Sequence, residues 1–87
     1  MARTLYLLIA PDPDSIPDSL DLIGEGRRFA PGIYCILSDL TRSKLYHRIK
    51  WQLADDAALL LAPLEEPPKF KGMDAGALSW LRSLDLD

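Results

Sequence analysis

The sequence is poor in cysteine and histidine, and these shortages exclude several kinds of site. Cys35 is the one cysteine among 87 residues, so neither an intrachain disulfide nor a cysteine-based metal site is expected. Because Cys35 lies within an apolar run, we expect an inert, buried thiol. His47 is the one histidine, so a single chain cannot assemble a histidine-based metal site or a Ser-His-Asp triad. We expect His47 to face solvent.

Long apolar segments are also missing. No run approaches the roughly 20 apolar residues that cross a membrane. The apolar run Leu5–Ala10 is too short for the core of a signal peptide and is followed by acids. We therefore expect a cytoplasmic protein without membrane contact.

Positive charge is in short supply as well. Lys and Arg number 10 against 13 Asp and Glu, which gives a formal net charge of −3. This balance argues against a general affinity for nucleic acid but leaves room for a local basic patch. The hydrophobic content of 48% is typical of a folded globule. The length predicts one domain, 1–87, with a core at 4–63 and a connector and helix at 64–87.

Apolar periodicity and turn residues predict the order of elements. Apolar runs indicate strands at 4–10, 33–37 and 57–62, and a short charged strand at 27–30 that forms a hairpin across Pro31-Gly32. Ser15 and Asp18 have capping-box spacing, which predicts a helix over 16–23 that ends at Gly24. Thr41 is the expected N-cap of a basic helix over 42–53. A third helix is expected over 74–84, with Leu78, Trp80, Leu81 and Leu84 on it.

This order predicts an α+β, ferredoxin-like βαββαβ fold with an additional C-terminal helix. Such a sheet normally has one polar face. Here the first strand is apolar on both faces, as is 58–62. A third helix, a second copy of the chain, or both must therefore cover the second face, and we expect a homodimer.

Acids gather after the first strand. A carboxylate at the end of a central strand can hold Mg²⁺ together with water and substrate phosphate, and Asp12 is the candidate ligand. One Asp12 from each chain of a dimer could share the ion. Helix capping and acid placement at a helix N-terminus explain the same residues, and we favour that interpretation. The cluster comprises Asp12, Asp14, Asp18 and Asp21.

The helix over 42–53 concentrates positive charge next to Trp51. Cations beside an exposed aromatic side chain can bind phosphates and stack bases. A solvated helix face, with Trp51 under the C-terminal segment or in an oligomer contact, explains the pattern too, and we favour it. The candidate binding residues are Arg42, Lys44, His47, Arg48, Lys50 and Trp51.

The segment Lys69-Phe70-Lys71-Gly72-Met73 is a weaker candidate. A phosphate-binding loop would need more glycines and a helix in the right register. We therefore expect a connector anchored by Phe70.

Two runs carry a family resemblance: Gly32-Ile33-Tyr34-Cys35-Ile36-Leu37-Ser38-Asp39-Leu40-Thr41 and Leu53-Ala54-Asp55-Asp56-Ala57-Ala58-Leu59-Leu60-Leu61-Ala62. With Phe70-Lys71-Gly72 and Trp80-Leu81, the chain resembles the small Cas2-like proteins, including the SinR family. The resemblance implies a ferredoxin-like homodimer and, for some members, a metal-dependent nuclease or a nucleic-acid scaffold in CRISPR adaptation. The family's metal-linked aspartate follows an aromatic residue. Here Asp12 follows Ala10-Pro11, which weakens the nuclease assignment.

These observations favour a small dimeric Cas2-like protein that binds nucleic acid or protein and has no resident cofactor. One alternative is a Mg²⁺-dependent endonuclease that uses Asp12. Another is an acidic interaction or regulatory domain without nucleic-acid contact.

Overall fold

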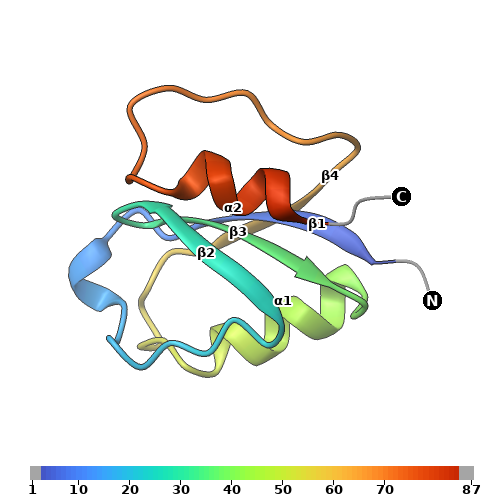
Figure 1. The fold of residues 1–87 in the computed structure, drawn as a ribbon. Helices are drawn as coiled ribbons and strands as arrows, with labels where there is room; N and C mark the ends of the chain where they lie inside the picture. Colours follow the sequence, from blue (N-terminus) through green and yellow to red (C-terminus); the bar gives the residue numbers. More distant parts are fainter. Residues whose placement is uncertain (1–2, 85–87) are drawn as a thin grey trace.

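A computed structural model describes residues 3–84 as one antiparallel sheet with two helices. The strand order is β2-β3-β1-β4, and the helices lie on opposite faces of this sheet (Figure 1). The predicted α+β class is confirmed, and the strand order is compatible with a ferredoxin-like fold. The elements are β1 (Thr4–Ile9), the 3-10 turn η1 (Pro13–Ser15), β2 (Glu25–Ala30), β3 (Ile33–Ser38), α1 (Arg42–Lys50), β4 (Leu60–Leu64) and α2 (Ala77–Ser83).

The central strand β1 is apolar on both faces, as its sequence predicts. Leu5 joins a core cluster under α2, whereas Tyr6 and Leu8 join a second cluster against α1. The Tyr6 hydroxyl is buried but donates to the Leu40 carbonyl at 2.8 Å, so its polar end is satisfied. The sheet therefore has a hydrophobic cluster on each side.

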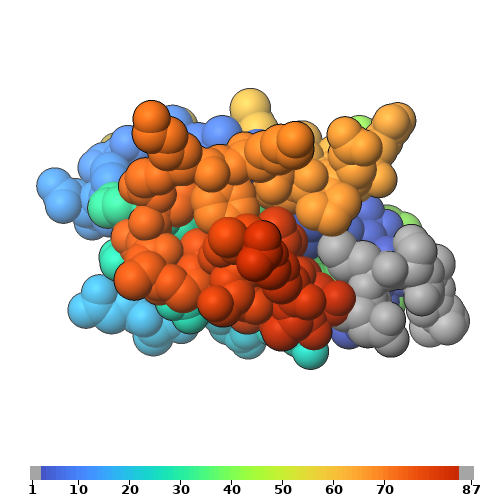
Figure 2. Space-filling model, turned by 45° about the horizontal axis from the view of Figure 1, so that its top comes forward, coloured from blue at the N-terminus to red at the C-terminus, as the bar shows by residue number. Residues whose placement is uncertain are grey.

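The second face is covered within the chain. Phe29 of β2 packs edge-on against Phe70 of the connector, with ring centroids 4.8 Å apart, and against Trp80 of α2 at 6.0 Å. Ala77 and Leu81 of α2 are buried in the same cluster. Figure 2 shows the connector and α2 forming the surface over this face. Coverage of this face thus needs no second copy, and the homodimer stays a prediction.

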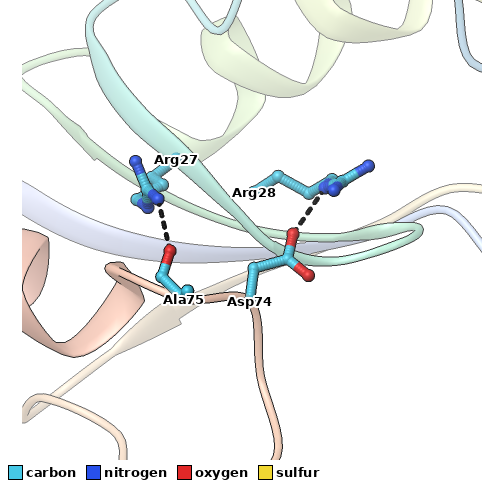
Figure 3. A network of polar contacts seen from close by, with 4 residues as sticks. All are labelled: Arg27, Arg28, Asp74 and Ala75. Carbon is cyan, nitrogen blue, oxygen red and sulfur yellow. Dashed lines mark hydrogen bonds and ion pairs between the residues drawn. The ribbon is translucent and has the colours of Figure 1, made fainter.

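Two neighbouring arginines of β2 hold the connector to the sheet edge (Figure 3). Arg27 Nη2 donates to the Ala75 carbonyl at 2.7 Å, and Arg28 Nε donates to Asp74 Oδ2 at 2.7 Å. The Asp74 N–H also donates to the Phe29 carbonyl at 2.6 Å. The connector therefore takes up a backbone acceptor of this edge strand, as protected edges require.

The helix predicted over 16–23 is wrong. After η1 the chain runs without helix to β2, and Leu20, Leu22 and Ile23 pack against the α1-side cluster from this irregular segment. The expected capping box does not form, because the Ser15 hydroxyl donates backwards to the Asp12 carbonyl at 2.8 Å. A ferredoxin-like sheet order is thus present without the first of its usual helices.

Two boundaries also differ from the prediction. Helix α1 ends at Lys50 rather than at 53, and the residues after it form turns. Strand β4 begins at Leu60 rather than at 57, and Pro63 lies inside it opposite Tyr6. Because β4 is an edge strand with one ladder only, it tolerates a proline that a central strand would not.

Candidate functional site

Helix α1 presents a fixed face to solvent because its other face is anchored. Leu45 and Ile49 are fully buried against the sheet. The predicted N-cap is confirmed, since Thr41 Oγ1 accepts the Lys44 N–H at 3.3 Å. Residues two positions from Leu45 or Ile49, such as His47 and Trp51, therefore project toward solvent at the helical period.

The solvent side of α1 carries the predicted cations, and we call it the basic α1 face. All five cationic or titratable side chains on it are exposed, and the prediction that His47 faces solvent is confirmed. The ion pairs between described residues, Arg3–Glu25 at 3.7 Å and Arg28–Asp74 at 2.7 Å, use none of them. The positive charge of this face is therefore not taken up by an ion pair within residues 3–84. The face comprises Arg42, Lys44, His47, Arg48, Lys50 and Trp51.

Trp51 stands out on this face. Its side chain is 76% exposed, although a tryptophan that contributes to folding normally buries most of its surface. The His47 and Trp51 rings lie 6.0 Å apart with an interplanar angle of 32°, and Tyr46 meets His47 edge-on at 5.3 Å. The interpretation that Trp51 lies under the C-terminal segment is wrong for the described residues. These rings form an open aromatic row along a positively charged helix.

Lys50 links the aromatic row to the helix end. Its ammonium lies 5.8 Å from the centroid of the Tyr46 ring, within the range of a cation–π contact. His47, Arg48 and Lys50 occupy the last turn of α1, where cations favour the negative end of the helix dipole. Some of this positive charge therefore also stabilises the helix.

Two hollows border the basic α1 face. One, of about 530 Å³, lies between α1 and β4, and Arg42, Tyr46, His47 and Leu60 line it. The other, of about 390 Å³, lies at the C-terminal end of α1, and we call it the α1-end pocket. Tyr46 lines both hollows, so they adjoin one another along the helix. The lining of the α1-end pocket includes Tyr46, Lys50, Trp51, Leu53, Asp55 and Leu59.

Asp12, the candidate Mg²⁺ ligand, is a capping residue in this structure. It is exposed, and its Oδ1 accepts the Asp14 N–H at 3.2 Å at the start of η1. Among residues 3–84, no three His, Cys, Asp or Glu side chains gather in a way that could hold a metal ion. One exposed carboxylate engaged in a cap does not fit a resident Mg²⁺ site within one chain. The capping role that the sequence favours is what the geometry shows.

The connector residues behave as predicted. Phe70 is anchored against Phe29, and Gly72 has φ 77°, a left-handed conformation that glycine accepts without strain. Lys69 and Lys71 are exposed. An anchored connector, rather than a phosphate-binding loop, describes this segment.

The expected burial of Cys35 is confirmed. It is 1% exposed in the centre of β3. Desolvation by burial raises the pKa of Cys35 to about 11 from an ordinary value of 9.0. Because the thiolate is the nucleophile, this shift leaves Cys35 outside any candidate chemistry.

Sequence reasoning missed three residues of this region. Tyr46 is half-buried beside both hollows. Asp55, in the turn before β4, lines the α1-end pocket. Leu60 is 52% exposed, although its run was expected to be buried. The i, i+4 spacing of Tyr46 with Lys50, and of His47 with Trp51, is the signal that could have revealed the aromatic row.

Comparison with known proteins adds no assignment: no family model, no curated protein and no solved structure matches this chain. Within residues 3–84, neither helix is long and apolar enough to cross a membrane.

Proposed function

We propose that this protein binds single-stranded nucleic acid through the basic α1 face. One observation carries the proposal: Trp51 is 76% exposed on a helix whose cations have no ion-pair partner among the described residues. A large exposed indole is costly to keep in water, and a flat partner that stacks on it offsets that cost. Nucleobases are flat, and the phosphates attached to them pair with lysine and arginine.

The side chains of the basic α1 face are expected to contact different parts of the strand. Arg42, Lys44, Arg48 and Lys50 attract the phosphate backbone, a contact that releases counterions and is independent of sequence. Trp51 offers a stacking surface that is available only to a base whose own face is free. A paired, stacked base in a duplex lacks such a free face, so single strands are the expected ligand.

The test is binding of a fluorescein-labelled oligothymidylate of about 12 nucleotides, a length within the ~4–16 nucleotides bound by comparable single-strand surfaces. Fluorescence anisotropy is measured from roughly 50 to 200 mM salt. We expect binding that weakens steeply with salt. Arg48→Gln with Lys50→Gln should reduce the slope of log affinity against log salt by about 0.7 per lost phosphate contact. Trp51→Ala should weaken binding by about 5- to 150-fold, which corresponds to a stacking contribution of roughly 1–3 kcal/mol.

The connector supplies a matched control. Lys69→Gln with Lys71→Gln removes the same charge from exposed positions outside the basic α1 face. This variant should retain nearly all of the affinity. Equal losses in both double variants would mean that α1 is not the contact surface. Absence of binding at the lowest salt concentration would overturn the proposal and favour the acidic protein-interaction alternative.

We also propose the ferredoxin-like identity and the homodimer implied by the Cas2-like resemblance. The observation that favours a second copy is the edge strand β4. Among residues 3–84 it pairs only with β1, and it carries Leu60 with 52% of its surface exposed. An apolar edge strand is a template for pairing with another chain. Sedimentation equilibrium tests this directly: a dimer mass that Leu60→Lys converts to a monomer mass supports it. A monomer mass for the parent protein overturns it.

The nuclease alternative is tested in the same preparations. Incubation of the labelled oligonucleotide with Mg²⁺ should leave it intact if the protein only binds. Cleavage that Asp12→Ala abolishes would instead establish the Mg²⁺-dependent endonuclease. Asp14→Ala is the control, because Asp14 is exposed in the same turn.

A further inference from the structure

The α1-end pocket has a volume and a set of lining residues that suit one small, flat group. Its volume of about 390 Å³ is at the small end of the roughly 300–1,000 Å³ found for ligand sites. Trp51 and Tyr46 give it aromatic walls, and Leu53 and Leu59 add apolar ones. A planar ring can therefore enter with its faces against apolar surface.

Two opposite charges line the same pocket. Lys50 contributes an ammonium, which only donates hydrogen bonds, and Asp55 contributes a carboxylate, which only accepts them at neutral pH. The two do not form an ion pair within 4.0 Å, since the ion pairs between described residues lie elsewhere. Each group thus remains open to a ligand that offers an acceptor to Lys50 and donors to Asp55.

We infer that the α1-end pocket holds one nucleobase of the bound strand and selects guanine. This inference rests on the proposed function and specifies its ligand. Guanine presents N1–H and N2–H side by side, which suits the two oxygens of the Asp55 carboxylate, and its adjacent O6 accepts from Lys50. Thymine and uracil offer one donor, N3–H, and adenine offers one amino group, so none of these bases presents two adjacent donors to the two oxygens of the Asp55 carboxylate.

The aromatic row strengthens the assignment. Trp51 belongs to the basic α1 face and also lines the α1-end pocket. A strand that stacks one base on the open side of Trp51 therefore has a neighbouring base within reach of the pocket. Lys50 likewise belongs to the basic α1 face and lines the α1-end pocket. Its ammonium lies beside the Tyr46 ring, which lines the same pocket.

The test compares oligothymidylates that carry one central guanine, inosine, adenine or thymine. Inosine is the sharpest probe, since its base keeps N1–H and O6 and lacks only the amino group. We expect the guanine strand to bind about 5- to 10-fold more tightly than the thymine strand, the lower part of the range for a bidentate contact to a base. Inosine should fall between them.

Asp55→Ala should bring the affinities for the guanine and thymine strands within about twofold of each other. Its affinity for oligothymidylate should equal or exceed that of the parent protein, because a negative charge is removed. Asp56→Ala is the matched control: it removes the same charge from the next residue, which is exposed and does not line the pocket. That variant should keep the guanine preference. Far-UV circular dichroism checks that both variants fold.

The outcomes separate the two proposals. Equal affinity of the parent protein for guanine and thymine strands overturns the guanine site and leaves single-strand binding in place. The same holds if Asp55→Ala and Asp56→Ala keep the same guanine preference. No binding of any strand overturns both.

Discussion

The side-chain amide of Gln52 pairs with both backbone groups of Asp21. Gln52 Oε1 accepts the Asp21 N–H at 2.7 Å, and Gln52 Nε2 donates to the Asp21 carbonyl at 2.7 Å. The amide thus replaces the partner that a helix or a sheet would provide. This contact joins the irregular segment before β2 to the turn that follows α1.

Gln52→Ala is expected to lower the free energy of unfolding by about 1.5–3 kcal/mol. It removes the two hydrogen bonds to Asp21 and a third from Gln52 Nε2 to the Arg48 carbonyl at 3.2 Å, each worth about 0.5–1.5 kcal/mol, at a partly exposed site. Urea denaturation monitored by circular dichroism measures this. Gln52→Glu is the control, because it keeps an acceptor for the Asp21 N–H and removes the donor. It should cost at least as much as Gln52→Ala, because a carboxylate oxygen would then face the Asp21 and Arg48 carbonyls at the negative end of the α1 dipole. Equal stability of all three proteins would show that the contact does not hold the segment.

The same segment shows where sequence reasoning failed. Ser15 and Asp18 have the spacing of a capping box, but local spacing does not reveal that Gln52, far along the chain, competes for the backbone of Asp21. Ile23 adopts φ 55°, a conformation that ends any helix, and its N–H is held by Asp21 Oδ1 at 2.9 Å. A tertiary contact and an Asx-type turn therefore override the apolar periodicity.

Where local and tertiary preferences agree, prediction succeeded. The Thr41 cap and the hairpin across Gly32, with φ 80°, both follow from residues close in sequence. The cations of α1 were identified as well. The α1-end pocket was not, because its lining joins the helix to the loop before β4, a juxtaposition that only the fold creates.

Gly76 is expected to tolerate substitution less well than Gly72. Both have positive φ, 89° and 77°, so alanine strains the backbone at either position by about 1 kcal/mol. A Cβ at Gly76 would also lie 2.8 Å from Arg27 Nη2, whereas a Cβ at Gly72 meets nothing within 4 Å. Gly76→Ala should therefore disturb the contact of Arg27 with Ala75 as well.

The pair of alanine variants isolates that contact. Thermal denaturation should show Gly76→Ala to be less stable than Gly72→Ala by about 0.5–1.5 kcal/mol, the net worth of one hydrogen bond. In an Arg27→Ala background, the difference between the two glycine sites should shrink. A difference that persists there would place its origin in the backbone alone.

Cys35 makes stability depend on alkaline pH. Burial raises the pKa of the thiol from 9.0 to about 11 in the folded protein, so between these values the folded state retains a proton that the unfolded state releases. Unfolding then becomes easier as pH rises. At about 1.4 kcal/mol per pKa unit, ionisation of the Cys35 thiol lowers the free energy of unfolding by on the order of 3 kcal/mol. This loss is complete above the folded-state pKa of about 11.

Cys35→Ala tests this pH dependence. The difference in free energy of unfolding between the parent protein and Cys35→Ala should be constant below pH 9 and should shift in favour of the variant between pH 9 and 11. Ionisations that the two proteins share cancel in this difference. A difference that stays level through this range would contradict the assignment.

The two tryptophans are expected to separate binding from folding. Trp51 is 76% exposed, so Trp51→Ala should change the free energy of unfolding by no more than about 0.5 kcal/mol, as for ordinary surface substitutions. Trp80 packs against Phe29 at 6.0 Å within the α2-side cluster. Trp80→Ala should cost about 2–3 kcal/mol, somewhat below the 3–5 kcal/mol typical of a fully buried tryptophan, because Trp80 is only half-buried.

Chemical denaturation of both variants, read beside their oligonucleotide affinities, should place the loss of binding on Trp51 and the loss of stability on Trp80. If Trp51→Ala unfolds as easily as Trp80→Ala, its exposed ring contributes to the fold, and weaker binding by that variant no longer identifies a contact.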